Sequence, residues 1–169
     1  MKMTGALASL GITTAHLADC KLPPCEEAAE LVDAGQDIFE RPQRMTKATR
    51  DAWVAMSQAA ESDGITIQLV SAFRSVQYQC DVIQKKLDAG RSIDEILDVN
   101  APPGYSEHHT GRALDLTTPG VEVLTEAFES TRAFDWLTRN AEQFRFFLSY
   151  PRDNPFGVVY EPWHWAYRP

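Results

Sequence analysis

The sequence predicts an α+β domain in which helices pack on a small antiparallel sheet. Helical and strand-like segments are mixed along the chain, without the regular strand–helix–strand order that builds a parallel sheet. The chain has 169 residues, 44% of them hydrophobic, which suffices for one domain with a sizeable core. Its net charge of −8 disfavours nucleic acid or an anionic membrane as a partner, since both repel an acidic surface.

The first half of the chain supplies a hairpin, a long helix and a strand. Residues 1–28 are expected to form a short helix and a proline-containing loop. Two apolar pairs around a Gly-Gln step predict a β-hairpin over residues 30–45. Thr46 can cap a helix that runs through about residue 61, because apolar side chains follow it at helical spacing. Alternating apolar residues then predict a strand over residues 65–70.

The second half continues the mixture of helices and strands. Apolar residues at helical spacing predict a helix over residues 76–90, and a Ser-x-x-Glu capping box predicts a shorter helix over residues 92–99. Residues 100–111 contain two prolines and two glycines and are expected to form a loop before a strand over residues 113–117. The remaining expected elements are a helix at 134–144 and strands at 146–150 and 158–160.

The N-terminal segment bears on the compartment. No run of the sequence reaches the length of a transmembrane helix. Residues 1–18 are mildly apolar, but they include His16, and Asp19 stands where a lipoprotein cleavage site needs a small residue. We therefore expect this segment to belong to the mature protein. The protein is expected to be a cytoplasmic monomer, with the periplasm as the alternative compartment.

Two short motifs supply the residues of a metal site. The first runs from Ser106 to Asp115 (SEHHTGRALD), and the second runs from Glu161 to Trp165 (EPWHW). A catalytic zinc site has three protein ligands, a fourth position for water and a general base nearby. The two motifs offer two imidazoles and one carboxylate as ligands, with a second carboxylate as base: His108, Asp115, His164 and Glu161.

The local sequence indicates how the first motif places its donors. Gly111 lets the backbone turn between His108, at the end of a loop, and Asp115, on the following strand. On that strand Leu114 and Leu116 point to one face and Asp115 to the other. A carboxylate held against a sheet in this way requires a charged partner or a metal.

The second motif is expected at a strand end or in a tight turn. Pro162 disfavours a helix that would begin before it and pass through Glu161 and His164. Glu161 then lies beside the metal, close enough to take a proton from a bound water. Trp163 and Trp165 are expected to wall the site and to lower its dielectric constant.

Each of these features also has a structural interpretation. A lone histidine is more often structural than a ligand, and His109 is expected to point away from His108. Asp115 on a strand can instead pair with an arginine, for which Arg112 and Arg74 are available. The combination of the two motifs is what favours the metal site.

The same motifs resemble those of the zinc D,D-peptidases of the VanY/VanX type, which share the Hedgehog/D,D-peptidase fold. The pattern Ser-x-His-x-x-Gly-x-Ala-x-Asp at residues 106–115 is followed by Glu-x-x-His at residues 161–164. A third element, Ser71–Gln79 (SAFRSVQYQ), is similar to the family's Ser-x-x-Arg-Ser…Gln segment. The resemblance spans residues 71–165. We expect an N-terminal extension over residues 1–40, packed on a catalytic domain over residues 41–169.

The resemblance implies a role for each matching residue. It implies zinc ligation by His108, Asp115 and His164, with Glu161 as the catalytic base. It further implies that Arg74 polarises the scissile carbonyl. By the same resemblance, the terminal D-residue of the peptide is contacted by two other side chains: Ser106 and Gln79.

The function that these expectations support is a zinc D-alanyl-D-alanine carboxypeptidase acting on peptidoglycan stem peptides or their precursors. Zinc lowers the pKa of a bound water to about 7, and Glu161 activates that water as the nucleophile. An L,D-carboxypeptidase or a cell-wall endopeptidase with the same site is the first alternative. A zinc-containing binding module without activity and a metal-free domain, in which these residues serve packing, are the others.

Overall fold

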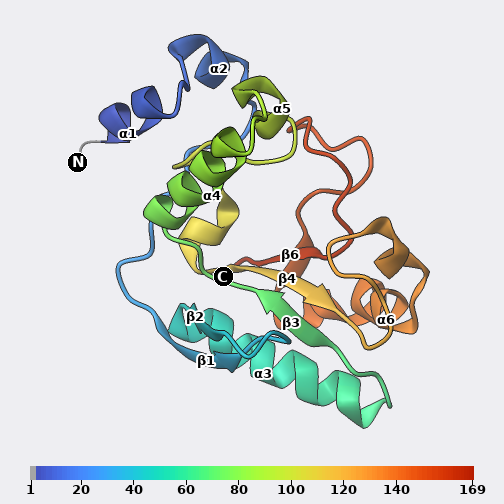
Figure 1. The fold of residues 1–169 in the computed structure, drawn as a ribbon. Coiled ribbons are helices and arrows are strands. Elements are labelled where there is room, and N and C mark those ends of the chain that lie inside the picture. The colour runs from blue at the N-terminus through green and yellow to red at the C-terminus, as the bar shows by residue number, and fades with distance from the viewer. Residues whose placement is uncertain (1–2) are drawn as a thin grey trace.

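The protein is organised around a four-stranded antiparallel sheet in the order β3-β4-β6-β5. The computed structural model describes residues 3–169 (Figure 1), so residues 1–2 of the expected N-terminal helix lie outside it. A separate two-stranded hairpin precedes the sheet, and the α+β class is confirmed. The strands are β1 (Val32–Gln36), β2 (Pro42–Met45), β3 (Gln68–Ser71), β4 (Ala113–Thr117), β5 (Phe146–Leu148) and β6 (His164–Tyr167).

Two of the helices begin at the capping residues that the sequence indicates. The Thr46 side chain accepts from the Thr49 backbone, and Ser92 and Glu95 form the expected capping box. The α-helices are α1 (Met3–Ser9), α2 (Thr14–Asp19), α3 (Lys47–Ser62), α4 (Val76–Asp88), α5 (Ile93–Leu97) and α6 (Arg132–Asn140). Three short 3₁₀ helices complete the described chain: η1 (Glu107–Thr110), η2 (Glu126–Ser130) and η3 (Ala141–Phe144).

Several expected boundaries differ from the structure. The expected strand over residues 158–160 is wrong, and the last strand is β6, which begins at His164. Residues 158–160 have no regular structure, and the Asn154 side chain donates to the carbonyls of Pro151 and Val158, which holds the preceding segment 151–158 in a compact loop. The segment 1–28 holds two short helices in place of one, and β3 begins at Gln68 rather than at residue 65.

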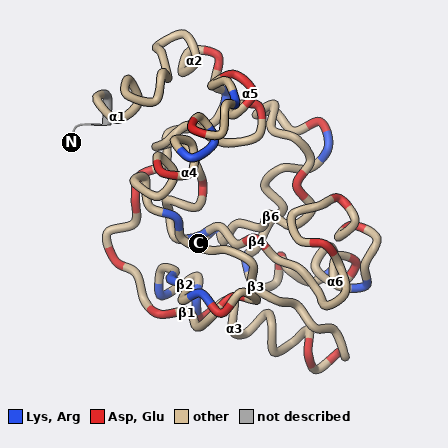
Figure 2. Tube along the Cα trace, in the orientation of Figure 1, with Lys and Arg blue, Asp and Glu red and all other residues tan. Residues whose placement is uncertain are grey.

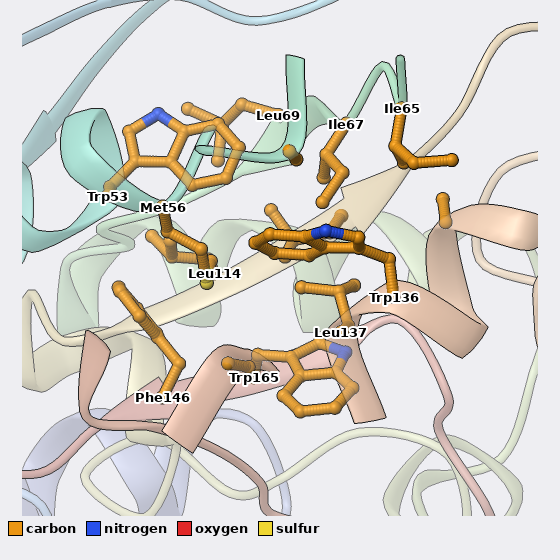
Figure 3. Close-up of a cluster of buried hydrophobic side chains, with 14 of the residues drawn as sticks. Trp53, Met56, Ile65, Ile67, Leu69, Leu114, Trp136, Leu137, Phe146 and Trp165 are labelled. Carbon is orange, nitrogen blue, oxygen red and sulfur yellow. The ribbon is translucent and has the colours of Figure 1, made fainter. Parts of the chain in front are cut away.

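One face of the sheet packs on α3 and α6 to form the main hydrophobic core (Figure 3). Leu114 on β4 is paired with Trp165 on β6, and both side chains point into this core together with Leu116. Because neighbouring residues on a strand alternate between faces, Asp115 and His164 point to the opposite face. The core-facing residues therefore fix the orientation of these two polar side chains.

The N-terminal segment packs on the helices of the opposite side of the sheet. In Figure 1, α1 and α2 lie beside α5 and α4, far from α3 and the hairpin. A second hydrophobic cluster joins α1 and the turn after it to α4 and α5: Ala6, Leu7, Leu10, Ile12, Cys80, Ile83 and Ile96. Backbone hydrogen bonds from Cys25 to Gly104 and from Ala28 to His109 tie the rest of the segment to η1 and to the loop before it.

Charge is distributed along the chain. Figure 2 shows the acidic residues spread over helices, loops and strands, with basic residues between them. Over residues 3–169, no helix is both apolar enough and long enough to cross a membrane.

Candidate metal centre

Three donor atoms from distant parts of the chain meet on the face of the sheet opposite the main core. Asp115 on β4 is directly paired with His164 on β6, and Asp115 Oδ1 lies 3.2 Å from His164 Nδ1. His108, from η1 just before β4, places Nε2 at 3.2 Å from the same oxygen. All three residues are buried, and one donor atom of each lies within 4.8 Å of the others. This is a donor set that suits a divalent metal ion, zinc in particular.

The hydrogen bonding of His108 supports the presence of a cation. His108 Nδ1 donates to the backbone oxygen of Ala72 at 2.5 Å, since a carbonyl can only accept. Burial lowers the pKa of His108 to about 4, so the ring is neutral and Nε2 carries a lone pair. That lone pair has no hydrogen-bond partner among residues 3–169, yet it faces the carboxylate of Asp115. Two buried acceptors facing each other repel, and a cation between them would turn this repulsion into attraction.

His164 is held from both sides. Nδ1 faces Asp115, and Nε2 lies 2.9 Å from Glu107 Oε2. Burial lowers the pKa of His164, but the hydrogen bonds with Asp115 and Glu107 outweigh it and raise the pKa to about 10. With both of its nitrogens facing carboxylates, the protonated ring donates to Asp115 and to Glu107. To bind a metal through Nδ1, His164 would have to lose the proton on that nitrogen. The proton on Nε2 would stay and would still be donated to Glu107.

Arg74 approaches the same carboxylate from the segment after β3. Its guanidinium donates to Asp115 Oδ2 at 3.0 Å, while Arg74 Nε is buried and has no partner among the described residues. Of the two arginines that the sequence offered as partners of Asp115, Arg74 forms the pair. Burial raises the pKa of Asp115, but His108, His164 and Arg74 lower it, and the carboxyl stays ionised with a pKa well below its usual range.

Glu161 lies beside the donor group and is not part of it. Its Oε2 is 3.7 Å from His164 Nδ1, and it lies in the turn before β6, as expected from Pro162. Burial raises the pKa of Glu161, although the charge of His164 opposes this effect. A carboxylate whose pKa is raised toward neutrality is better suited to accept and return a proton.

A groove of about 390 Å³ opens at the donor group. Every predicted site residue except the buried Asp115 lines it: Arg74, Gln79, Ser106, His108, Glu161 and His164. Gln79 donates to the Ala101 backbone oxygen at 2.8 Å, and its own buried Oε1 has no partner within the described chain. Ser106 is also buried at the start of η1. The far walls come from residues 16–22, from α5 and the loop after it, and from residues 156–159.

The aromatic wall differs from the expected one. Trp165 is buried in the main core and Trp163 packs against it, so neither lines the groove. Trp165 faces away because it is the next residue after His164 on β6, and Trp163 lies in the turn before that strand. Tyr150 takes their place, with its ring centroid 4.7 Å from that of His164.

His109 has a structural role, in agreement with the expectation that one histidine of the pair points away. Its Nδ1 donates to the Arg74 backbone oxygen at 2.7 Å, and its Nε2 accepts from the Gly104 amide at 3.1 Å. Both ring nitrogens are therefore used. The ring ties the loop before η1 to the segment that carries Arg74.

The sequence of this chain is similar to those of known carboxypeptidases. Residues 42–169 match the family model described as VanY: D-alanyl-D-alanine carboxypeptidase. The chain belongs to the VanY family. YodJ of Bacillus subtilis (strain 168), which is named as a carboxypeptidase, is 34% identical over 156 residues, covering 86% of the chain and 56% of YodJ. The chain spans about half the length of the curated relatives it matches.

Solved structures similar to this VanY-family chain include two peptidases. The LD-carboxypeptidase LdcB shares 33% sequence identity with a TM-score of 0.74, over 86% of this chain and 71% of LdcB. VanYB, solved in complex with D-alanine-D-alanine, shares 25% identity with a TM-score of 0.66, over 86% of this chain and 81% of VanYB. These likenesses agree with the expected peptidase fold.

Two residues at the centre of this VanY-family site were not identified from the sequence as part of it. Glu107 lies inside the first motif, next to His108 and His109, and this position was the one feature of the sequence that could have indicated a role at the site. Its hydrogen-bond partner, His164, is 57 residues away. Tyr150 carries no motif and reaches the site because β5 ends beside β6. Both contacts depend on strand pairing across long stretches of sequence.

Proposed function

We propose that the protein is a zinc D-alanyl-D-alanine carboxypeptidase acting on peptidoglycan stem peptides or their precursors. The observation that carries the proposal is the convergence of His108 Nε2, His164 Nδ1 and Asp115 Oδ1 at the groove, with an unpaired lone pair facing a carboxylate. These three residues would hold the zinc. When bound in such a site, zinc polarises a carbonyl and lowers the pKa of a water to about 7.

The other side chains of the groove supply the remaining steps of amide hydrolysis. Glu161 accepts the proton of the attacking water and returns it to the leaving amine, for which its raised pKa is suited. Arg74 lines the groove beside Asp115, and its guanidinium would donate to the oxyanion that develops on the scissile carbonyl. The reaction needs no covalent intermediate.

Recognition of the substrate falls to the polar residues beyond the zinc ligands. Gln79 and Ser106 both line the groove, and the buried Gln79 Oε1 has no hydrogen-bond partner within the described chain. Both would contact the terminal D-residue. The family description and the D-alanine-D-alanine bound to VanYB support a substrate of this kind.

An L,D-carboxypeptidase is the second candidate, because the LD-carboxypeptidase LdcB has the higher TM-score and identity of the two structures. The two activities differ in the residue before the scissile bond, which is D in one substrate and L in the other. The family model favours the D,D activity.

The division of the chain is also a proposal. We infer that residues 1–40 are an extension packed on a catalytic domain formed by residues 41–169. The family match begins at residue 42, and the cluster of α1 with α4 and α5 supports the packing of the extension.

The test combines metal analysis with an assay of D-Ala release. Purified protein should carry about one zinc per chain and lose most of it in His108→Ala and His164→Ala. Muropeptides with a pentapeptide stem, which end in D-Ala-D-Ala, should release D-Ala faster than those with a tetrapeptide stem. Release from the tetrapeptide alone would assign the L,D activity. Zinc binding without release from either substrate would favour a binding module.

A further inference from the structure

We propose that Glu107 is a positioning residue that holds His164 with its Nδ1 directed at the metal position. The inference rests on the proposed function, since it assigns a support to one of the proposed zinc ligands. Glu107 Oε2 lies 2.9 Å from His164 Nε2, on the side of the ring away from Asp115. The carboxylate therefore fixes both the orientation of the ring and the nitrogen that carries the proton.

The two histidines differ in what holds them. His108 donates to a neutral acceptor, the backbone oxygen of Ala72, while His164 donates to a carboxylate. A carboxylate acceptor makes the opposite ring nitrogen a stronger base and hence a stronger ligand. The side chain of Glu107 is 27% exposed, so it bridges the buried ring and the solvent.

The position of Glu107 distinguishes support from catalysis. Glu107 is absent from the described lining of the groove, whereas Glu161 is part of it and lies near Nδ1 of the same ring. A substrate in the groove would meet Glu161. Glu107 would act only through His164, from behind the ligand.

The local turn keeps Glu107 in place. It is the first residue of η1, directly before His108, and the Thr110 hydroxyl donates to its backbone oxygen at 2.6 Å. One short turn thus supplies a zinc ligand and the support of another ligand that comes from β6. We expect the two histidines to be coupled through this turn.

The experiment measures zinc affinity by chelator competition, without substrate, in the wild type, Glu107→Ala and Glu107→Gln. Glu107→Ala should bind zinc about 10- to 100-fold more weakly, the usual effect of losing such a support. Glu107→Gln should lose less, because its amide oxygen still accepts the Nε2 proton but carries no charge. Glu161→Gln is the matched control: it removes a carboxylate near the same ring that makes no hydrogen bond to it, and its zinc affinity should stay near wild type.

Spectroscopy separates positioning from a general loss of stability. The ¹⁵N spectrum of the zinc-loaded protein should show the His164 Nε2 proton hydrogen-bonded in the wild type and exchanging with water in Glu107→Ala. The proposal is overturned if Glu107→Ala loses less than about tenfold in affinity, the lower end of that range. It is also overturned if the variant loses zinc as completely as His164→Ala, because Glu107 would then be a ligand. A wild type that binds zinc but releases no D-Ala would refute the proposed function and leave this inference standing.

Discussion

Asp115 and His164 face each other directly across β4 and β6, with 3.2 Å between Oδ1 and Nδ1, although 49 positions separate them in the sequence. Opposite residues in an antiparallel pair lie on the same face of the sheet, so the strand register alone brings two proposed ligands together. A register shift of one residue would turn His164 into the core and Trp165 toward the groove. The packing of Leu114 and Trp165 in the core therefore fixes the strand register that places Asp115 opposite His164.

Glu161→Gln should separate the enzyme from a binding module. The change keeps the size of the side chain but removes the base, so D-Ala release should fall by roughly 10²–10⁴-fold. Zinc content and melting temperature should stay near wild type, because Glu161 is outside the donor group. Release at the wild-type rate would mean that another group is the base, and loss of zinc would make Glu161 a ligand.

Variants of Arg74 should show whether this residue stabilises the oxyanion or serves only in the ion pair with Asp115. If its guanidinium stabilises the oxyanion, Arg74→Ala should lower kcat by roughly 10²–10³-fold. Arg74→Lys should restore the charge beside Asp115 but not full activity, since an ammonium lacks the planar fork. The measurements are kcat and the melting temperature of each variant. A variant that melts earlier yet keeps its turnover per folded molecule would assign Arg74 to the ion pair alone.

Gly111 connects His108 to β4 at a backbone φ of +64°, where a side chain would be strained and would crowd its neighbours. A Cβ there would lie 2.7 Å from Leu31 Cδ2 and 3.2 Å from the Thr46 backbone nitrogen. Gly64 is a matched control, since its φ is +73° and a Cβ would meet nothing within 4 Å. Gly64→Ala should cost about 1–2 kcal/mol of unfolding free energy from backbone strain alone. Gly111→Ala should cost about 1–3 kcal/mol more from overpacking, as measured by urea unfolding of the metal-free proteins. If both variants lost the same unfolding free energy, the residues around Gly111 would have moved aside at no energetic cost.

Asp37 should make the stability of the fold dependent on pH. Its buried carboxylate accepts from the Phe39 and Arg41 backbones and from the side chains of Arg41 and Gln43. Burial raises the pKa of Asp37, but these hydrogen bonds outweigh it and lower the pKa below its ordinary value of 3.8. The stabilisation is therefore complete above that value and is lost as the pH falls through the lowered one.

Asp37→Asn should accordingly reduce the free energy of unfolding at pH 7, and its difference from wild type should shrink as the pH falls below 3.8 and through the lowered pKa of Asp37. Urea unfolding across this range is the measurement. Asp51→Asn is the control, because Asp51 is ion-paired but exposed and should contribute little. A gap that stays constant with pH would show that Asp37 acts through shape rather than charge.

The network of Asp37 also reaches the segment that carries Arg74. Gln43 Oε1 accepts from the Ala72 amide, and Arg41 donates to the Val70 oxygen at 2.9 Å. The β1–β2 hairpin is thereby fixed to β3, close to the oxygen of Ala72 that holds His108. None of these contacts was predicted from the sequence, because they join side chains of a hairpin to the backbone of a distant strand.

The sequence by itself determined the α+β class, the starts of α3, α4 and α5, and the strand that carries Asp115, because capping residues, glycines and apolar periodicity act within a few residues. It also determined which residue types were available for zinc. Tertiary structure decided the rest: the pairing of Asp115 with His164, the bond from Glu107 to His164, the burial of Trp165 and the start of the last strand at His164 in place of residues 158–160. These depend on strand register and on the packing of one core face, which couple residues far apart in the chain and leave no periodic pattern in the local sequence.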